Sequence, residues 1–533
     1  MIRRVLLGLI AAALLAFGVV PLLLLATGAG DFAGILDQGD ALVNTVLLAG
    51  GVVVTAGVFG TPLGLVFARY QVPGWMSGAS LLPYAIPPYV TTIAWIALAN
   101  PTTGWLRSTG VNVYSLPGMI WVLGLHLAPV VALNVRDATL RLDPALEEAA
   151  RLCGASRSRV LRDVTLPMLA PAALTAAGFV ASASIASFGV PYLLSAAATH
   201  PIPVLTTRIY NALDLGFVTG RPLAITLALL LLAVGAGVPL LVRAVLGGRS
   251  YTSARPVSAT PPPAPRGVIL GVGAWIGVAV GMPFGTVILT SLQRSLGGGL
   301  AIDNLTLATW TKLVGDTRIA EALTRSLLLA AVTATVAVVA GTLVAHAAER
   351  GGGRFVQALA AVGRAGYTVP GTVLALGLIL AYSQEVRFVL LDRVTFVLAL
   401  ADSLWILGIA YTLKFLALPL DGARAALRSL HPSLEEAARL CGASWGRTLR
   451  DVTVPLLLPA LATAWFLVFV PSFCEVTLSV LLRGPRTEVL GTLLFTLQSY
   501  ADAQSAAALA VLVTVVLLAG MTLGRVLGRP EVT

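Results

Sequence analysis

Charged residues are scarce in this sequence. Only 11% of its 533 residues are Asp, Glu, Lys or Arg, whereas a soluble globular domain carries about 25%. Apolar residues make up 57% of the chain, and the mean hydropathy is +0.90. This composition excludes a soluble enzyme, a disordered protein and a nucleic-acid binder. It predicts a polytopic membrane protein.

Cysteine and lysine are also scarce. Cys153, Cys441 and Cys474 are too few and too far apart for a disulfide framework or a metal site. Lys312 and Lys414 are the only lysines, so arginine carries nearly all of the positive charge behind the formal net charge of +11. The chain has no GxxxxGK(S/T) phosphate-binding motif and no Ser-His-Asp or His-Glu-x-x-His arrangement. We therefore expect no enzymatic activity, no metal and no cofactor bound by this chain.

The sequence contains long apolar runs with few charged residues. A helix needs roughly 20 apolar residues to cross a bilayer, and these runs are too continuous for the alternating segments of a membrane barrel. We interpret the first run as a retained helix, because it is too long for a signal peptide and lacks a clear cleavage site. The twelve predicted spans are 4–27, 41–68, 75–99, 116–136, 167–194, 222–246, 267–291, 323–347, 361–382, 396–420, 456–482 and 504–527.

The distribution of basic residues predicts the orientation of these spans. With the N-terminus placed inside, alternate loops hold 23 Lys and Arg on the inner side and 10 on the outer side. Acidic residues divide evenly, 11 to 11, so the asymmetry belongs to the basic residues alone. Both termini are predicted to be cytoplasmic.

An internal repeat divides the chain. Residues 146–172 read LEEAARLCGASRSRVLRDVTLPMLAPA and match residues 434–460 at 21 of 27 positions, with a weaker match between GTPLGLVFAR (60–69) and GTLVAHAAER (341–350). We predict two six-helix halves, 1–248 and 267–533, joined by a Pro/Ser-rich cytoplasmic linker over 249–266. Equal topology in both halves makes this a parallel repeat, with a pseudo-two-fold axis along the membrane normal. The fold class is thus all-α, with about twelve transmembrane helices in two bundles.

The repeated loop itself predicts a short amphipathic helix. Asp143 and Pro144 suit its start, and Gly154 suits its end. Leu146, Ala149, Ala150 and Cys153 share one narrow apolar face, and Glu147 and Arg151 are spaced for an ion pair. Small Ala and Cys side chains would let a partner approach closely. The alternative is an interfacial helix that lies on the membrane, although such a helix prefers bulky apolar residues and a Lys/Arg-rich face.

The sequence Glu148-Ala149-Ala150, followed by Gly154 and Pro167, resembles the signature loop of ABC-importer permeases. The pattern recurs in the second half as Glu436-Ala437-Ala438, Gly442 and Pro455. The resemblance implies a type I importer fold with two permease halves fused in one chain. It also implies that both loops are coupling helices, formed by Glu147, Glu148, Ala149, Ala150 and Gly154 and by Glu435, Glu436, Ala437, Ala438 and Gly442.

What the resemblance implies about partners follows from that role. Each coupling helix would dock in a groove of a cytoplasmic ATP-binding subunit, so two copies of that subunit are expected, and ATP and Mg would be used there. An extracytoplasmic binding protein would deliver the substrate, because the outer loops are too short to form a binding domain. The expected location is the bacterial inner membrane.

Two further segments narrow the resemblance. SFGVPYLL (187–194) with VLTTRIYNAL (204–213), and CEVTLSVLL (474–482) with VLGTLLFTLQSY (489–500), resemble ferric-iron permeases with fused halves. Thiamine, polyamine and phosphonate permeases are similar relatives. The second half departs from them at Cys474-Glu475-Val476, where a Glu-Leu-Pro-like turn is usual. Ferric iron is therefore the first expected substrate, with the other three behind it.

Acidic residues at membrane depth are functional candidates, and we find two. Glu475 follows Pro471 within a predicted span, so it either lines the pathway or hydrogen-bonds a broken helix backbone. Asp402 precedes Ser403 near a span end and suits a helix start. Phe188 and Gly189 occupy the turn of the first half that corresponds to Glu475, so they are pathway candidates as well, and a symmetric metal site is not expected because they offer no carboxylate.

Two other classes of protein compete with an importer permease. An ion-coupled secondary transporter with two six-helix halves would need no ATP-binding partner, but it predicts charges within several spans. A non-transporting scaffold that binds a partner through the repeated loops would tolerate tightly filled bundles. The many Gly, Pro and Ser residues in the predicted spans favour a moving pathway over such a scaffold.

Overall fold

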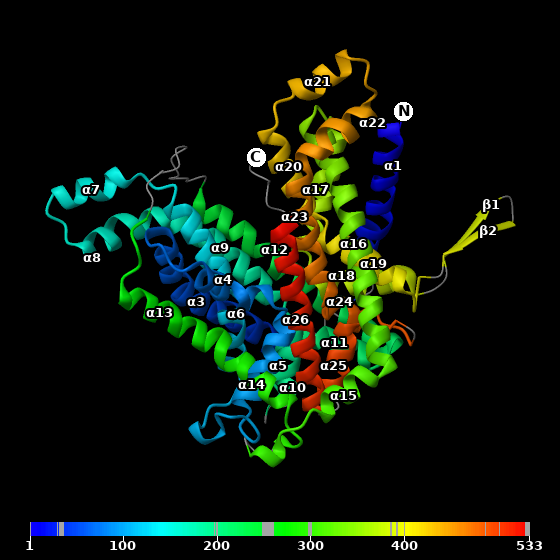
Figure 1. The fold of residues 1–533 in the computed structure, drawn as a ribbon. Helices are drawn as coiled ribbons and strands as arrows, with labels where there is room; N and C mark the ends of the chain where they lie inside the picture. Colours follow the sequence, from blue (N-terminus) through cyan, green and yellow to red (C-terminus); the bar gives the residue numbers. More distant parts are fainter. Residues whose placement is uncertain are drawn as a thin grey trace.

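The computed structural model describes residues 2–28, 30, 37–196, 198, 201–247, 261–296, 301–383, 386–390, 393–398, 400–485, 487–499 and 502–527. Nearly all of these residues are helical, and the long helices form one tightly packed body (Figure 1). The helical fold class predicted from the sequence is confirmed. Residues 248–260, which make up most of the predicted linker, lie outside the described residues.

In the described part of the first half, the assigned elements are twelve α-helices and three short turns of other helical types. They are α1 (Ile2–Leu14), a π-turn (Leu15–Val19), α2 (Val20–Thr27), α3 (Gly39–Arg69), α4 (Gly74–Ala85), α5 (Pro88–Ala99), a 3-10 turn (Arg107–Thr109), α6 (Leu116–Thr139), α7 (Pro144–Leu152), α8 (Arg157–Val160), a π-turn (Leu161–Thr165), α9 (Leu166–Ile185), α10 (Gly189–Ala196), α11 (Leu205–Asp214) and α12 (Phe217–Leu246).

The second half repeats this order and adds a β-hairpin. Its elements are α13 (Arg266–Ile276), a π-turn (Gly277–Gly281), α14 (Met282–Ser291), a 3-10 turn (Ile302–Asn304), α15 (Ala308–Gly315), α16 (Thr317–Glu349), α17 (Arg354–Thr368), α18 (Gly371–Tyr382), β1 (Val386–Leu390), β2 (Arg393–Leu398), α19 (Leu404–Phe415), α20 (Ala417–Ser429), α21 (Ser433–Leu440), α22 (Trp445–Thr448), a π-turn (Leu449–Thr453), α23 (Val454–Phe473), α24 (Thr477–Leu482), α25 (Leu490–Ser499) and α26 (Ala503–Leu527).

The number of spans agrees with the prediction from hydropathy. Within the described residues, nine helices are long and apolar enough to cross a membrane, and the number rises to twelve if each of three bent helix pairs counts as one span. The pairs are α4 with α5, bent by 98°, α17 with α18, bent by 112°, and α19 with α20, bent by 42°. About twelve spans are therefore confirmed, although three of them are not straight.

The two sharpest bends lie at equivalent places in the two halves. Ile86 and Val369 each precede a proline and have extended backbone, which is the conformation that a following proline favours. The prediction of continuous spans over 75–99 and 361–382 is corrected here. Membrane helices tolerate proline, but these two prolines end one helix and begin another in a new direction.

Three other predicted spans have wrong ends. The helices that begin at Arg157 and Trp445 end at Ile185 and Phe473, so predicted spans 167–194 and 456–482 each run across a break into a separate short helix, α10 or α24. The predicted span 396–420 starts too early, because β2 continues to Leu398 and α19 begins only at Leu404. Hydropathy does not distinguish an apolar strand or a broken helix from a continuous one.

Each half has a core of three long helices. In the first half α3, α6 and α9 pack together, and in the second half α16, α20 and α23 do so. Glycine permits the closest contacts: a Cβ atom at Gly60 would lie 2.4 Å from the Ala128 carbonyl oxygen, and one at Gly341 would lie 2.9 Å from the Leu420 backbone nitrogen. The weak repeat around 60–69 and 341–350 therefore marks equivalent helix crossings.

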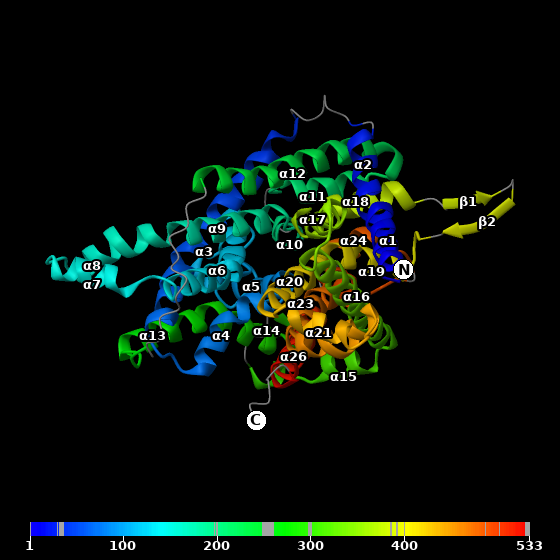
Figure 2. The same cartoon turned by 90° about the horizontal axis from the view of Figure 1, so that it is seen from above.

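The first span of each half packs against the opposite half (Figure 2). The Tyr382 hydroxyl of α18 donates a hydrogen bond to the Ala16 carbonyl at 2.8 Å, and α2 packs along α18. In the reverse direction, the Trp275 indole of α13 donates to the Ser80 carbonyl of α4 at 3.3 Å. The end of the linker is fixed to the same region, because the backbone nitrogen of Gln71 donates to the Pro262 carbonyl at 2.9 Å. The two halves are thus interlocked.

Candidate functional site

The repeated loops form short helices that project from the helical body, α7 with α8 in the first half and α21 with α22 in the second; in Figure 1 the first pair stands out at the upper left and the second at the top. Asp143 caps α7 by accepting a hydrogen bond from the Ala145 backbone nitrogen at 3.0 Å. Gly154 and Gly442 follow the two helices with φ of 84°, the left-handed conformation that ends a helix and favours glycine. The predicted helix and its glycine end are present in both copies, whereas the capped start belongs to the first copy, because α21 begins at Ser433 and Pro432 before it provides no side-chain cap.

The two loops expose a leucine at their tips. The side chains of Leu152 and Leu440 are 90% and 89% exposed, more than any other large hydrophobic residue described. The Ala149 and Ala437 side chains are exposed beside them. Sequence reasoning expected small Ala and Cys side chains on this surface and did not single out the leucines. An exposed leucine surrounded by small residues is a shape that can insert into an apolar cleft.

Glu147 and Glu435 turn away from this surface and attach each loop to its own bundle. Glu147 forms an ion pair with Arg69 at the end of α3 and accepts a hydrogen bond from the Thr165 hydroxyl at 2.6 Å. Arg151, the partner predicted from the helical spacing, lies 3.4 Å away and is the more distant of the two arginines. Glu148 is exposed.

The second loop repeats this attachment with equivalent residues. Glu435 lies 3.3 Å from Arg350, which occupies the place of Arg69 in the repeat, and accepts from the Thr453 hydroxyl at 3.2 Å. Glu436 is exposed, as Glu148 is. Sequence reasoning missed both arginines, although they end the two weakly matching segments 60–69 and 341–350 and could have been found there.

One difference separates the two attachments. His346 of α16 lies 3.1 Å from Glu435, whereas the corresponding residue in the first half is Leu65. Burial raises the pKa of the Glu435 carboxyl, but hydrogen bonds and charge from His346 and Arg350 outweigh it, so the pKa lies below its usual 4.5.

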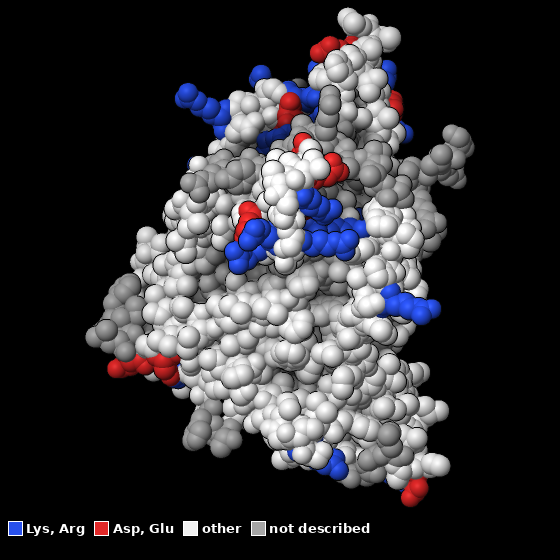
Figure 3. All heavy atoms as spheres, turned by 90° about the vertical axis from the view of Figure 1, so that its left-hand side faces the viewer, with Lys and Arg blue, Asp and Glu red and all other residues white. Residues whose placement is uncertain are grey.

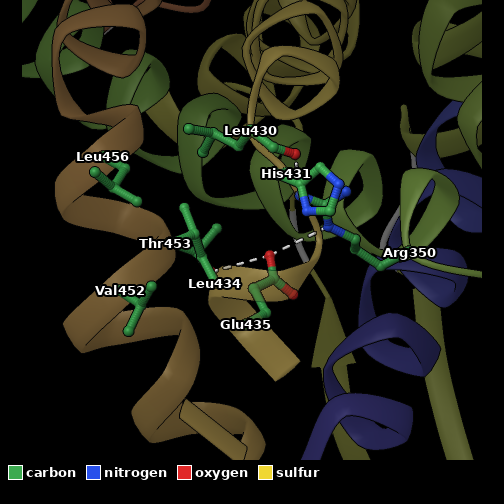
Figure 4. Close-up of a pocket in the computed structure, with 8 residues that line it drawn as sticks. All are labelled: Arg350, Leu430, His431, Leu434, Glu435, Val452, Thr453 and Leu456. Carbon is green, nitrogen blue, oxygen red and sulfur yellow. Dashed lines mark hydrogen bonds and ion pairs between the residues drawn. The ribbon is translucent and has the colours of Figure 1, made fainter. Parts of the chain in front are cut away.

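Figure 4 shows Glu435 beneath a hollow between α21 and the start of α23. The hollow has about 170 Å³ of space including its open mouth, too little for a typical ligand pocket.

Basic residues surround the projecting loop of the first half. In Figure 3 this end of the molecule carries most of the visible Lys and Arg side chains, and below it lies a broad area whose few charged side chains are at its edges. Such an area matches the hydrocarbon core of a bilayer, and the basic end matches the side that the charge count predicts to be cytoplasmic.

The breaks after α9 and α23 hold the predicted pathway residues. Glu475 lies in the second break, where its carboxylate accepts hydrogen bonds from the backbone nitrogens of Leu478 at 2.6 Å and Ser479 at 3.3 Å. The Lys414 ammonium group lies 2.8 Å from the same carboxylate, whose side chain is only 5% exposed. Glu475 therefore holds a broken helix in place and is paired, which agrees with one of the two interpretations made from the sequence. Sequence reasoning missed Lys414.

Phe188 and Gly189 lie in the corresponding break of the first half. Phe188 is buried and its ring contacts those of Tyr192 and Tyr210 at 5.4 and 5.3 Å between centroids. A Cβ at Gly189 would lie 2.8 Å from the Tyr89 ring, so this position leaves room for an aromatic neighbour. The two breaks are equivalent in the repeat but differ in chemistry, one aromatic and one charged.

Asp402 lies apart from both breaks. It is exposed, precedes α19 and has a φ of 57°, the one non-glycine residue with positive φ among those described. It packs closely against Gly484, where an added Cβ would lie 2.3 Å from the Asp402 carboxylate. The structure places it just before a helix start, beside the loop that follows α24, and not with the other pathway candidates.

Comparison with known protein families explains this architecture. The family described as binding-protein-dependent transport system inner membrane component matches residues 60–246 and again residues 337–529. The chain belongs to this family. It is a multi-pass membrane permease with two copies of the family domain, and the family is one of transport components and not of enzymes.

Known relatives resemble nearly the whole permease. A protein named "Probable ABC transporter permease protein y4fN" from Sinorhizobium fredii is 25% identical over 90% of this chain and 85% of its own length. The ferric transport system permease protein FbpB of Actinobacillus pleuropneumoniae is 24% identical over 85% of this chain and 66% of its own. The Fe(3+)-transport system permease protein FbpB 2 of Haemophilus influenzae is 24% identical over 91% of this chain and 88% of its own length.

Proposed function

We propose that this permease forms the membrane pathway of an ATP-driven importer and is coupled to ATP-binding subunits through α7 and α21. The observation that carries this proposal is the pair of loops, each with an exposed leucine at its tip and each held to a long helix by a buried or half-buried glutamate. A rigid attachment of this kind transmits a push on the loop to α3 or α16.

Both loops present the same exposed residue types, which favours one kind of partner at both positions. Leu146, Glu148, Ala149, Leu152 and Cys153 are exposed on the first loop, and the same residue types are exposed at the equivalent positions of the second. The helices around them have diverged, so this identity points to two surfaces that meet one kind of protein. We therefore propose two copies of a single ATP-binding subunit, where ATP and Mg are used, while this chain binds no cofactor itself.

The orientation that we propose rests on the distribution of basic residues. We propose that the basic, loop-bearing end lies in the cytoplasm, with both termini on that side, and that the opposite end receives an extracytoplasmic binding protein. Ferric iron is the proposed substrate, because two relatives that align with most of the chain carry ferric transport in their names. Thiamine, polyamines and phosphonates come after it.

The coupling part of this proposal is tested by purification from native membranes. We compare the wild-type protein with the double variant Leu152→Asp/Leu440→Asp and with Leu307→Asp, which adds the same charge at a position that is 65% exposed and far from both loops. The wild type and Leu307→Asp should retain an ATP-binding subunit in a ratio of two to one chain, and the double variant should lose it. A folded wild-type protein without any such subunit would favour the ion-coupled secondary transporter.

The substrate is tested separately by uptake. Cells that depend on this permease are given radioactive ferric iron, with and without depletion of ATP, and unlabelled thiamine, polyamine and phosphonate serve as competitors. Iron uptake that requires ATP and resists these competitors supports the assignment. ATP-dependent uptake of another substrate would replace iron without affecting the coupling proposal.

A further inference from the structure

Two short helices in the middle of the molecule, α11 and α25, are anchored by equivalent hydrogen bonds. The backbone nitrogen of Leu205, at the start of α11, donates to the Thr45 hydroxyl of α3 at 3.0 Å. The backbone nitrogen of Leu490, at the start of α25, donates to the Ser326 hydroxyl of α16 at 2.8 Å. These contacts place α11 and α25 in the same way within their own halves.

The anchors identify an equivalent pair of residues that touch. Tyr210 lies five residues after Leu205, and Phe495 lies five residues after Leu490. Their rings contact each other edge to face, with centroids 6.1 Å apart. When two equivalent positions of a two-fold arrangement touch, the axis passes between them. The pseudo-two-fold axis of this permease therefore runs through the Tyr210–Phe495 contact.

Three more aromatic rings surround the Tyr210–Phe495 contact on the axis. Phe495 also lies 4.6 Å from Tyr192 and 6.4 Å from both Phe188 and Tyr89, measured between ring centroids. Tyr89, Phe188, Tyr192 and Phe495 are all buried or partly buried in one apolar cluster. The first half contributes four of the five rings, and the second half contributes Phe495 alone.

The equivalent positions in the second half carry no aromatic ring. Thr372, Val476 and Val480 stand where the first half has Tyr89, Phe188 and Tyr192. Val476 and Val480 are buried in the same apolar cluster as Phe495. Phe495 is thus a single aromatic side chain of the second half that packs among four aromatic rings of the first.

We propose that Phe495, seated among Tyr89, Phe188, Tyr192 and Tyr210, is the outer gate of the transport pathway and is closed in this structure. A parallel repeat places the pathway on its axis, and the rings lie on the axis. Phe188 and Tyr192 follow a helix of 29 residues that begins in the first coupling loop, so the ring cluster lies roughly 40 Å from that loop along the helix, toward the face that we propose to be the outer one. This inference rests on the proposed import pathway between the halves.

Cys474 serves as a built-in reporter of this gate. It lies beside Glu475, is 4% exposed and belongs to the same buried cluster as Phe495. Cys153 and Cys441 are exposed on the coupling loops, so both are replaced by serine. Spheroplasts carrying the full-length permease are then treated from outside with a charged, membrane-impermeant methanethiosulfonate, and labelling of Cys474 is followed over time.

The gate predicts a specific pattern of labelling. Phe495→Ala should label at least about tenfold faster than the parent, because solvent then reaches the thiol, whereas Phe284→Ala should not. Phe284 is a matched control, because it is buried in the same cluster but is not one of the five rings. Equal labelling rates in Phe495→Ala and the parent would overturn the proposal.

A second measurement covers the case in which Phe495→Ala does not reach the membrane. Tyr210→Cys/Phe495→Cys, with all three native cysteines replaced, should be bridged by a short bifunctional methanethiosulfonate, which would stop substrate uptake until a reductant is added. Failure to form the bridge, or uptake that continues with the bridge formed, contradicts a closed gate at this contact. The labelling of Cys474 requires neither an ATP-binding subunit nor a substrate, so a failure of that measurement is distinct from a failure of the proposed function.

Discussion

Removing Lys414 should destabilise the permease far more than removing both members of its ion pair. The Glu475 side chain is 5% exposed, and Lys414, 2.8 Å away, is the cation that compensates its charge. In Lys414→Met the carboxylate is left buried without a counter-ion, which costs about 3–5 kcal/mol. Its two backbone hydrogen bonds remain but do not neutralise it.

The double variant Lys414→Met/Glu475→Gln should recover most of this loss. The glutamine side-chain oxygen can still accept hydrogen bonds from Leu478 and Ser479, and no buried charge remains. We expect a net cost of about 1–2 kcal/mol, so the second substitution should recover about 2–3 kcal/mol of the loss caused by Lys414→Met.

Unfolding of the purified protein in mixed micelles by sodium dodecyl sulfate measures these differences. Lys312→Met is the matched control, because Lys312 is the other lysine of the chain, is 70% exposed and lies 3.5 Å from Asp502. Its loss should cost no more than about 1 kcal/mol. If Lys414→Met unfolds at the same detergent fraction as Lys312→Met, the pair does not hold the break after α23, and the reasoning is wrong.

Three further outcomes follow from the attachments and helix crossings. Arg69→Leu should speed tryptic cleavage of the first coupling loop more than Arg350→Leu speeds cleavage of the second, because Glu435 keeps a second partner in α16; mass spectrometry of the fragments measures both rates. Gly60→Leu should prevent normal folding or lower the melting temperature strongly, because its Cβ meets a backbone carbonyl, while Gly57→Leu, with nothing within 4 Å, should melt like the wild type. The stability that Glu435 contributes should be complete above pH 4.5 and be lost as the pH falls through its lower folded pKa, so that melting temperatures of the wild type and Glu435→Gln converge in acid.

The sequence predicted the features that depend on local pattern. The number of spans, the duplication, the loop helices with Asp143 and their terminal glycines all follow from periodicity and from residues close in the chain. The direction in which the Glu147 side chain points could not be predicted in the same way. Its nearer arginine partner is 78 residues away, and only the crossing of α3 with the loop brings them together.

The breaks in the spans show a second limit. Pro87 and Pro370 were visible in the sequence, but a membrane helix can bend mildly or sharply at a proline, and packing decides between these outcomes. The aromatic cluster was invisible for a stronger reason. Tyr89 and Phe495 stand 406 positions apart in the chain, and they meet because two halves pack around an axis.

The exchange of first spans between the halves has a consequence for biogenesis. The ribosome releases α1 and α2 into the membrane long before α18, against which they pack, has been made. The first half in turn cannot cover α4 and α5 until α13 and α14 have been inserted. Neither half is therefore a finished folding unit. A chain cut within the linker should yield two fragments that are each unstable alone and persist in cells only when both are produced together.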